Sequence, residues 1–346
     1  MNIGIRVDVN PVIATGHIKR DIAIALCLRQ LGQECIFLSA DEYCLPYLKP
    51  YGFESIILNS NWQEMEGELP QLTEVIRSRR IASLLVDSYQ ITPGYMKELI
   101  PLTYVTYFDE MGLFGYGCQQ LINGVLEPPD YSAAAARALS GPKYVALRRE
   151  FVDLSPKQIR PQIRTLLVTS GGTDPYHFCA AFLEKFLMHP NWQQVKVTVA
   201  VGELSVDREY LTEKYQENDR VTILVNCNHM AQLMQQADYA VTAGGTTLYE
   251  ICATGVCASS YAIADNQLEV TKSFHRLGLV SYAGDFRAEP EETIERILEQ
   301  MQAVTAAEER LKRSIRLQQI VDGKGALRIA QALIDGPGKE EAVQTE

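Results

Sequence analysis

The sequence predicts an α/β protein built from two doubly wound, Rossmann-like domains in tandem. Short apolar runs alternate with helical stretches, a pattern typical of parallel sheets covered by helices on both faces. The alternation stops over the proline-rich residues 124–162 and then restarts, which indicates a domain boundary. A chain of 346 residues is long enough for two cores. We therefore expect a first domain at 1–150, a second at 151–335 and a disordered tail at 336–346.

In the first domain, continuous apolar runs predict the strands, and apolar residues at helical spacing predict the helices. The expected strands are 3–8, 35–38, 55–58, 81–87, 103–108 and a last short one at 121–123; the helices are 16–31, 62–78 and a short one after Pro93. In the second domain the expected strands are 164–169, 195–200, 221–225, 239–242 and 256–261. The expected helices there are one that ends near 188, one that begins after 264, and those at 207–216, 229–236, 247–253, 290–304 and 306–333. Two such domains would face each other across a cleft at the carboxyl ends of their strands, the expected active site.

Composition narrows the classes of function. The net charge of −11 argues against nucleic acid or an anionic membrane surface as the main partner. The sequence shows neither a signal peptide nor an apolar run of membrane-spanning length, so we expect a cytoplasmic protein without membrane insertion. Eight cysteines without a Cys-x-x-Cys pair are expected to be free thiols.

His17 is the expected chemical centre, because Gly16-His17 joins the first strand to the first helix. Glycine permits close approach of a ligand to the backbone, and a helix N-terminus favours negative charge. Histidine is also the most frequent general base in proteins, although a lone histidine is often only structural or exposed. One glycine in place of the three of Gly-x-Gly-x-x-Gly disfavours a dinucleotide cofactor.

Three aspartates end strands of the first domain and are expected to converge beneath His17: Asp8, Asp87 and Asp109. A carboxylate bonded to His17 would fix its tautomer and raise its basicity. The alternative is that each aspartate caps the turn after its strand. We favour this alternative for Asp87, because Asp87-Ser88-Tyr89 resembles an ordinary turn, and leave it open for the other two.

Two glycine pairs of the second domain each stand between a strand and a helix: Gly171-Gly172 and Gly244-Gly245, the second followed by Thr246 and Thr247. Backbone N–H groups at such junctions can bind a diphosphate. Glu250, in the helix that follows, could accept hydrogen bonds from ribose hydroxyls or simply stabilise its own helix terminus. The chain contains no Asp-x-Asp, so we expect charge neutralisation without a metal, and no cofactor.

The chain resembles the nucleotide-sugar hydrolases of pseudaminic acid biosynthesis, which release UDP from UDP-2,4-diacetamido-2,4,6-trideoxy-β-L-altropyranose, and a close branch assigned to spore coat polysaccharide biosynthesis. The resemblance covers most of residues 1–280. Its motifs are Gly16-His17-Ile18-Lys19-Arg20-Asp21, Asp87, Asp109, Arg149-Glu150-Phe151, Gly171-Gly172-Thr173-Asp174, 243–255 and Asn266-Gln267. The 244–267 segment is also similar to MurG-like glycosyltransferases of the GT-B fold.

The resemblance implies a GT-B fold and a metal-independent hydrolase of a UDP-linked deoxy amino sugar, in which His17 activates water. It implies substrate-binding roles for Gly16, Arg20, Asp8, Asp87, Asp109, His177, Asn266 and Gln267, and nucleotide-binding roles for Gly171, Gly172, Thr173, Gly244, Gly245, Thr246, Thr247 and Glu250. The pair Gly244-Gly245 is more typical of a transferase and leaves the acceptor open. The alternatives are a GT-B glycosyltransferase with a UDP-sugar donor and a non-catalytic nucleotide-sugar-binding subunit. We expect the chain to act as a monomer.

Overall fold

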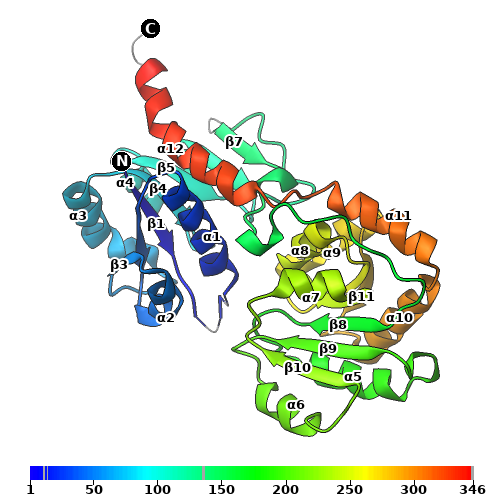
Figure 1. The fold of residues 1–346 in the computed structure, drawn as a ribbon. Helices are drawn as coiled ribbons and strands as arrows, with labels where there is room; N and C mark the ends of the chain where they lie inside the picture. The colour runs from blue at the N-terminus through cyan, green and yellow to red at the C-terminus, as the bar shows by residue number, and fades with distance from the viewer. Residues whose placement is uncertain (11, 14, 135–136, 344–346) are drawn as a thin grey trace. The chain divides into compact units, whose positions relative to one another are not determined.

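The structure is a computed structural model that describes residues 1–10, 12–13, 15–134 and 137–343. The chain divides into two compact units, one formed by residues 1–149 with the segment from Gly323 onward, the other by residues 150–322 (Figure 1). Each unit contains one sheet in which all strands are parallel. The predicted class, two doubly wound α/β domains, is confirmed.

The first sheet has seven strands in the order β3-β2-β1-β4-β5-β6-β7. Their bounds are β1 Asn2–Val7, β2 Cys35–Ser39, β3 Glu54–Ile57, β4 Ile81–Asp87, β5 Tyr104–Phe108, β6 Gln120–Asn123 and β7 Arg137–Ser140. Strand β7 was not predicted, because its four residues lie in the stretch interpreted as irregular. The order reverses between β1 and β4, where Val7 pairs with Asp87. Ligands of open α/β sheets bind at such a switch point, beyond the carboxyl ends of the strands.

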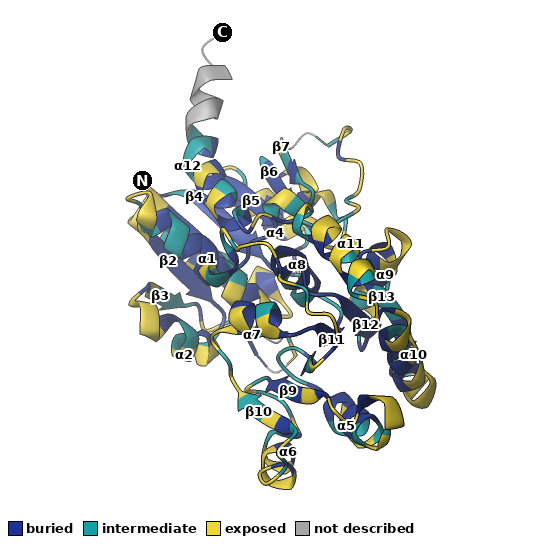
Figure 2. Cartoon of the chain, turned by 45° about the vertical axis from the view of Figure 1, so that its right-hand side comes forward, coloured by how far each residue is buried: buried dark blue, intermediate teal, exposed yellow. Residues whose placement is uncertain are grey.

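Five α-helices of this unit accompany the sheet: α1 Gly16–Gln30, α2 Leu45–Leu48, α3 Leu69–Arg79, α4 Pro93–Leu99 and α12 Gly325–Val343. Helix α3 begins later than predicted, after a short 3-10 segment at Met65–Glu68. Figure 2 shows the strands of the sheet buried, with exposed residues on the outer sides of the helices.

The second sheet has six strands in the order β10-β9-β8-β11-β12-β13. The strands are β8 Thr165–Thr169, β9 Lys196–Val201, β10 Val221–Val225, β11 Tyr239–Ala243, β12 Ala258–Ala262 and β13 Ser281–Asp285. The helices are α5 Phe178–Met188, α6 Arg208–Lys214, α7 Met230–Gln236, α8 Thr247–Thr254, α9 Asp265–Arg276, α10 Pro290–Ala303 and α11 Ala307–Gln318. The edge strand β13 was not predicted. Here the order reverses between β8 and β11, where Thr169 pairs with Thr242.

The C-terminal helix corrects the predicted domain limits. The helix expected at 306–333 is two helices, α11 and α12, separated by Gly323 in the left-handed region at φ 75°. Helix α12 lies beside α1 in the first unit (Figure 1), because its apolar residues Ile329 and Leu333 join the core under α1. Residues 323–335 therefore belong to the first unit.

The tail expected to be disordered at 336–346 is also revised. Helix α12 continues to Val343, and Gly336 is buried against the ring of Tyr104 on β5, where even a Cβ atom would collide. Residues 344–346 lie outside the described residues.

Candidate functional site

The first group of candidate residues lies at the start of helix α1, directly after the loop that follows β1. His17 is buried, with a relative exposure of 6%, and Arg20 follows it one helical turn later. Their spacing of three residues places both side chains on one face of the helix. That face meets the end of β4, the neighbour of β1 at the switch point.

Asp87, the last residue of β4, contacts both of these side chains. Its Oδ1 accepts from His17 Nδ1 at 2.8 Å, and Arg20 donates from Nε and Nη2 at 2.6 and 2.5 Å. Burial alone would raise the pKa of Asp87, but Arg20 and His17 together hold it below its ordinary value. A carboxylate fixed in this way keeps the proton of neutral His17 on Nδ1 and leaves Nε2 to accept one.

Two further side chains complete this cluster. The ring of Tyr89 stands edge-on to the imidazole of His17, with centroids 4.7 Å apart, and its hydroxyl donates to Glu110 at 2.7 Å. Glu110 also pairs with Arg20, whose guanidinium lies over the ring of Phe108. The sequence pattern alone did not single out Glu110 or Tyr89. Glu110 directly follows Asp109 and Tyr89 follows Asp87 by two residues, so their closeness to strand-end aspartates was the available signal.

The interpretation of Asp87 as a simple turn cap is wrong, since its carboxylate is taken by His17 and Arg20. Of the three strand-end aspartates, Asp87 contacts His17 because β4 is the strand paired with β1.

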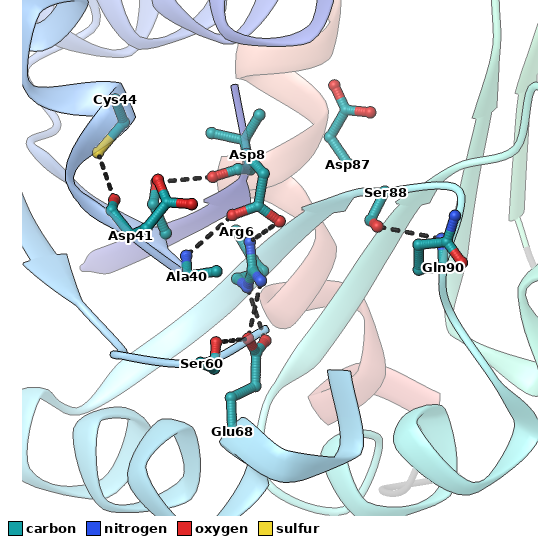
Figure 3. Close-up of polar contacts among 12 residues, drawn as sticks. Arg6, Asp8, Ala40, Asp41, Cys44, Ser60, Glu68, Asp87, Ser88 and Gln90 are labelled. Atoms are coloured by element: carbon teal, nitrogen blue, oxygen red, sulfur yellow. Dashed lines mark hydrogen bonds and ion pairs between the residues drawn. The ribbon is translucent and has the colours of Figure 1, made fainter. Parts of the chain in front are cut away.

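Asp8 has other partners, as Figure 3 shows. It accepts from the backbone N–H of Ala40 at 2.8 Å and pairs with Arg6 at 2.7 Å. Arg6 is fully buried and also donates to Glu68, at 2.6 and 2.7 Å. Burial opposes the charge of Arg6, yet Glu68 and Asp8 raise its pKa. Asp8 thus belongs to a buried ion-pair network at the end of β1.

Asp109 acts as a cap. Its carboxylate accepts from the backbone N–H groups of Leu113 and Phe114, at 2.7 and 2.9 Å, and from the hydroxyl of Tyr131 at 3.0 Å. This aspartate directly follows β5, which lies one strand further from β1 than β4 does. The expected convergence beneath His17 is therefore not found for Asp8 or Asp109, whose carboxylates are bonded elsewhere.

In the second unit, both predicted glycine pairs follow the two strands of the switch point, β8 and β11. Gly171 has a φ of 80°, and Gly172 lies so close to Gly202 that a side chain on Gly202 would collide with its carbonyl. The helix that follows does not offer its N-terminus as expected. Asp174 already accepts from the N–H groups of Phe178 and Cys179, both at 2.9 Å. Two N–H groups at the start of α5 are therefore already bonded, and a ligand at this loop would be held by the loop containing Gly171, Gly172 and Thr173 itself.

The second glycine loop leads into helix α8, whose N-cap residue makes no capping hydrogen bond through its side chain. Gly245 has a φ of 114° and Thr246 is the N-cap of the helix, whose first residue is Thr247. Glu250 lies in the first turn of α8. Gly244 serves packing, since a Cβ atom there would come within 2.7 Å of Thr271.

The remaining predicted residues lie in two places. Gln267, in the first turn of α9, is bonded through Oε1 to the N–H of Ile263, so it fixes the end of β12; its neighbour Asn266 precedes it in the same turn. His177 lies at the N-cap of α5 with a φ of 59°, and its exposed imidazole pairs with Asp207 at 2.8 Å.

Within the described ranges, no three His, Cys, Asp or Glu side chains are grouped so as to hold a metal ion. Among the helices described, none combines the length and apolar character needed to cross a membrane.

Comparison with known proteins finds similarity in sequence to a polysaccharide biosynthesis protein over nearly the whole chain. No family model matches. The chain is 24% identical over 346 residues to the spore coat polysaccharide biosynthesis protein SpsG of Bacillus subtilis, covering 97% of this chain and 98% of SpsG.

Solved structures share the architecture at low sequence identity. MurG of Acinetobacter baumannii matches with a TM-score of 0.69 at 12% identity, over 96% of this chain and 99% of MurG. The spinosyn rhamnosyltransferase SpnG matches at 0.67 and 11%, over 96% and 100% of the two chains. A putative UDP-N-acetylglucosamine 2-epimerase of Listeria monocytogenes matches at 0.65 and 13%, over 97% and 96%. With its two parallel-sheet Rossmann-like domains, the chain has the GT-B fold of MurG and SpnG.

Proposed function

We propose that this protein is a glycosyltransferase that uses a nucleotide-sugar donor, with His17 as its general base. The observation that carries the proposal is the buried pair of His17 and Asp87, held at 2.8 Å at the switch point of the first sheet. The similarity in fold to MurG and SpnG supports sugar transfer, and the similarity to SpsG supports a place in polysaccharide biosynthesis. Proteins that share a fold catalyse different reactions, so the proposed reaction depends on the residues of the site.

In this proposal the first unit supplies the base. Ionised Asp87 keeps the Nδ1–H of His17 directed toward itself, and Nε2 takes the proton of the acceptor hydroxyl. The acceptor oxygen forms a bond to the anomeric carbon with inversion, while the bond to the diphosphate breaks and the nucleoside diphosphate leaves with both electrons. Arg20 fixes Asp87 on its other side.

The second unit would bind the nucleotide. Gly245, Thr246 and Thr247 lie at the N-terminus of α8, where the side chain of Thr246 makes no capping hydrogen bond, and a helix N-terminus favours a diphosphate group. Glu250 would accept hydrogen bonds from the ribose hydroxyls. The loop at Gly171, His177 and the first turn of α9 are further substrate contacts in this proposal. Transfer would need no metal ion in this proposal, because the helix N-terminus and backbone N–H groups would neutralise the diphosphate.

Hydrolysis is the second candidate, with water in place of the acceptor hydroxyl. The resemblance of Gly16-His17 and Arg20 to the pseudaminic acid pathway hydrolases favours it. A specific observation also does: the side chain of His17 is only 8% exposed, enclosed by Asp87 and Tyr89. A base this enclosed is reached more easily by water than by a carbohydrate hydroxyl.

The deciding experiment measures release of nucleoside diphosphate from a panel of UDP- and TDP-sugars, with and without polysaccharide acceptors. The panel includes UDP-2,4-diacetamido-2,4,6-trideoxy-β-L-altropyranose. Release that depends on an acceptor supports transfer, and stoichiometric release of free sugar without one supports hydrolysis. Binding without turnover under every condition contradicts both reactions and favours a nucleotide-sugar-binding subunit. His17→Ala is the inactive reference, and His189→Ala, in the other unit, is the matched control.

A further inference from the structure

Asp21 is a buried carboxyl group for which the reaction as described has no use. It lies on α1, has no exposed surface, and neither of its oxygens meets a hydrogen-bond donor among the described residues. Burying a charged group without a partner is costly, so such a carboxyl group requires an explanation.

Its position relative to the catalytic pair is set by the helix. His17 and Asp21 are four residues apart on α1, and His17 and Arg20 of that face both contact Asp87. Asp21 is also within hydrogen-bonding reach of Asp87. Two carboxylates cannot bond to each other, since both only accept, but a carboxylic acid can donate to a carboxylate.

The partners of Asp87 decide which of the two groups holds the proton. Asp87 accepts from His17 Nδ1 and from two nitrogens of Arg20, all contacts that favour its ionised form. The cluster also contains Glu110, so that Arg20 already faces two carboxylates. A further negative charge on Asp21 would stand buried against them.

We propose that Asp21 is a positioning residue that remains protonated at neutral pH and donates its O–H to Asp87, holding Asp87 in the orientation that His17 requires. Its role in catalysis rests on the proposed function; its protonation does not. The proton count balances, because Asp21 keeps its proton while His17 takes the proton of the acceptor.

The surroundings support a neutral Asp21. Burial raises the pKa of Asp21 well above its ordinary value, and Asp87 and Glu110 raise it further, against the opposing effect of Arg20. Of the titratable groups on β2, the thiol of Cys35 is near enough for Asp21 to raise its pKa slightly, although burial is the main cause. Helix α12 packs on α1 as well, and two of its charged side chains are bonded to other groups. Arg328 donates to the carbonyl of Lys143, and Asp335 accepts from Gln331.

The first test measures protonation directly and needs no substrate. Infrared difference spectra of the wild type against Asp21→Asn at pH 7 should show the C=O stretch of a protonated carboxyl group that the variant lacks. The same comparison with Asp219→Asn, an exposed aspartate in the other unit, should show no such band. A missing band in the Asp21 comparison would overturn the proposal, whether or not the protein turns over any sugar.

The second test measures positioning. An asparagine keeps a donor toward Asp87, whereas alanine does not. The ¹⁵N spectrum of His17 should therefore show the same Nδ1–H tautomer in wild type and Asp21→Asn, and a loss of that single tautomer in Asp21→Ala. In kinetics, Asp21→Ala should lower kcat about tenfold with KM little changed, and Asp21→Asn should restore most of it. Equal spectra and equal kcat in wild type and Asp21→Ala would overturn the positioning role.

Discussion

Substituting Asp21 by asparagine should make the protein more stable at neutral pH, and more so as the pH rises. In the unfolded chain an aspartate has an ordinary pKa near 3.8, and burial raises the pKa of Asp21 well above that in the folded state. Above pH 3.8 the unfolded chain therefore releases a proton that the folded chain keeps. Rising pH thus favours unfolding of the wild type, and this contribution of Asp21 is absent from Asp21→Asn.

The size of the effect follows from the proton count. A difference of one bound proton changes the free energy of unfolding by about 1.4 kcal/mol per pH unit. Between pH 5 and pH 7 the variant should therefore gain roughly 2.7 kcal/mol relative to the wild type. Asp87 has the opposite sign, since its pKa is lowered on folding; its contribution is lost only below pH 3.8, outside the range from pH 5 to pH 7.

The assay is urea unfolding followed by the fluorescence of Trp62. The chain has two tryptophans, one in each unit, so a Trp192→Phe background leaves a reporter for the first unit alone. This separation is needed because a chain with two units need not unfold in one transition. Asp219→Asn, in the other unit, is the control and should leave the Trp62 transition unchanged at each pH. A difference between wild type and Asp21→Asn that does not vary with pH would refute the protonated state of Asp21.

Other predictions follow from the two units separately. His17→Ala should lower kcat by about 10²–10⁴-fold, the usual contribution of a general base. Calorimetry should show an unchanged affinity of this variant for UDP. Loss of UDP binding would make His17 a nucleotide contact or a structural residue. Turnover in excess EDTA should equal turnover in magnesium, and a large drop would reveal a metal-bridged diphosphate. Glu250→Gln should weaken UDP binding less than Glu250→Ala does, because a charged acceptor of hydrogen bonds contributes about 1.5–3 kcal/mol. Both variants should discriminate less than the wild type between UDP and 2′-deoxy-UDP. An unchanged preference for UDP over 2′-deoxy-UDP would remove Glu250 from the site. Asp174→Ala should destabilise the second unit by about 1–2 kcal/mol in the Trp192 transition, since it removes the acceptor for two N–H groups of α5; no change would show that water replaces the cap.

Much of the fold could be predicted from the sequence, because its signals are local. Continuous apolar runs revealed the central strands, such as Ile81–Asp87, and helical periodicity revealed α1 and α10. The short edge strands β7 and β13 carry weak periodic signals and were missed. The sequence also placed the candidate loops correctly, since Gly16-His17 and both glycine pairs stand between a strand and a helix.

Only the tertiary structure decided which side chains meet. Three aspartates end strands of the first sheet with similar local sequences, and the order β2-β1-β4-β5 selects Asp87 as the partner of His17. The packing of α12 against α1, and the closure of the α5 N-terminus by Asp174, are likewise invisible in the local pattern. Periodicity reports whether a residue is buried, whereas its partner depends on strand order and helix packing between segments far apart in the chain. For that reason the sequence by itself determined most of the elements and the candidate loops, and the pairing of strands and the packing of helices determined which side chains meet there.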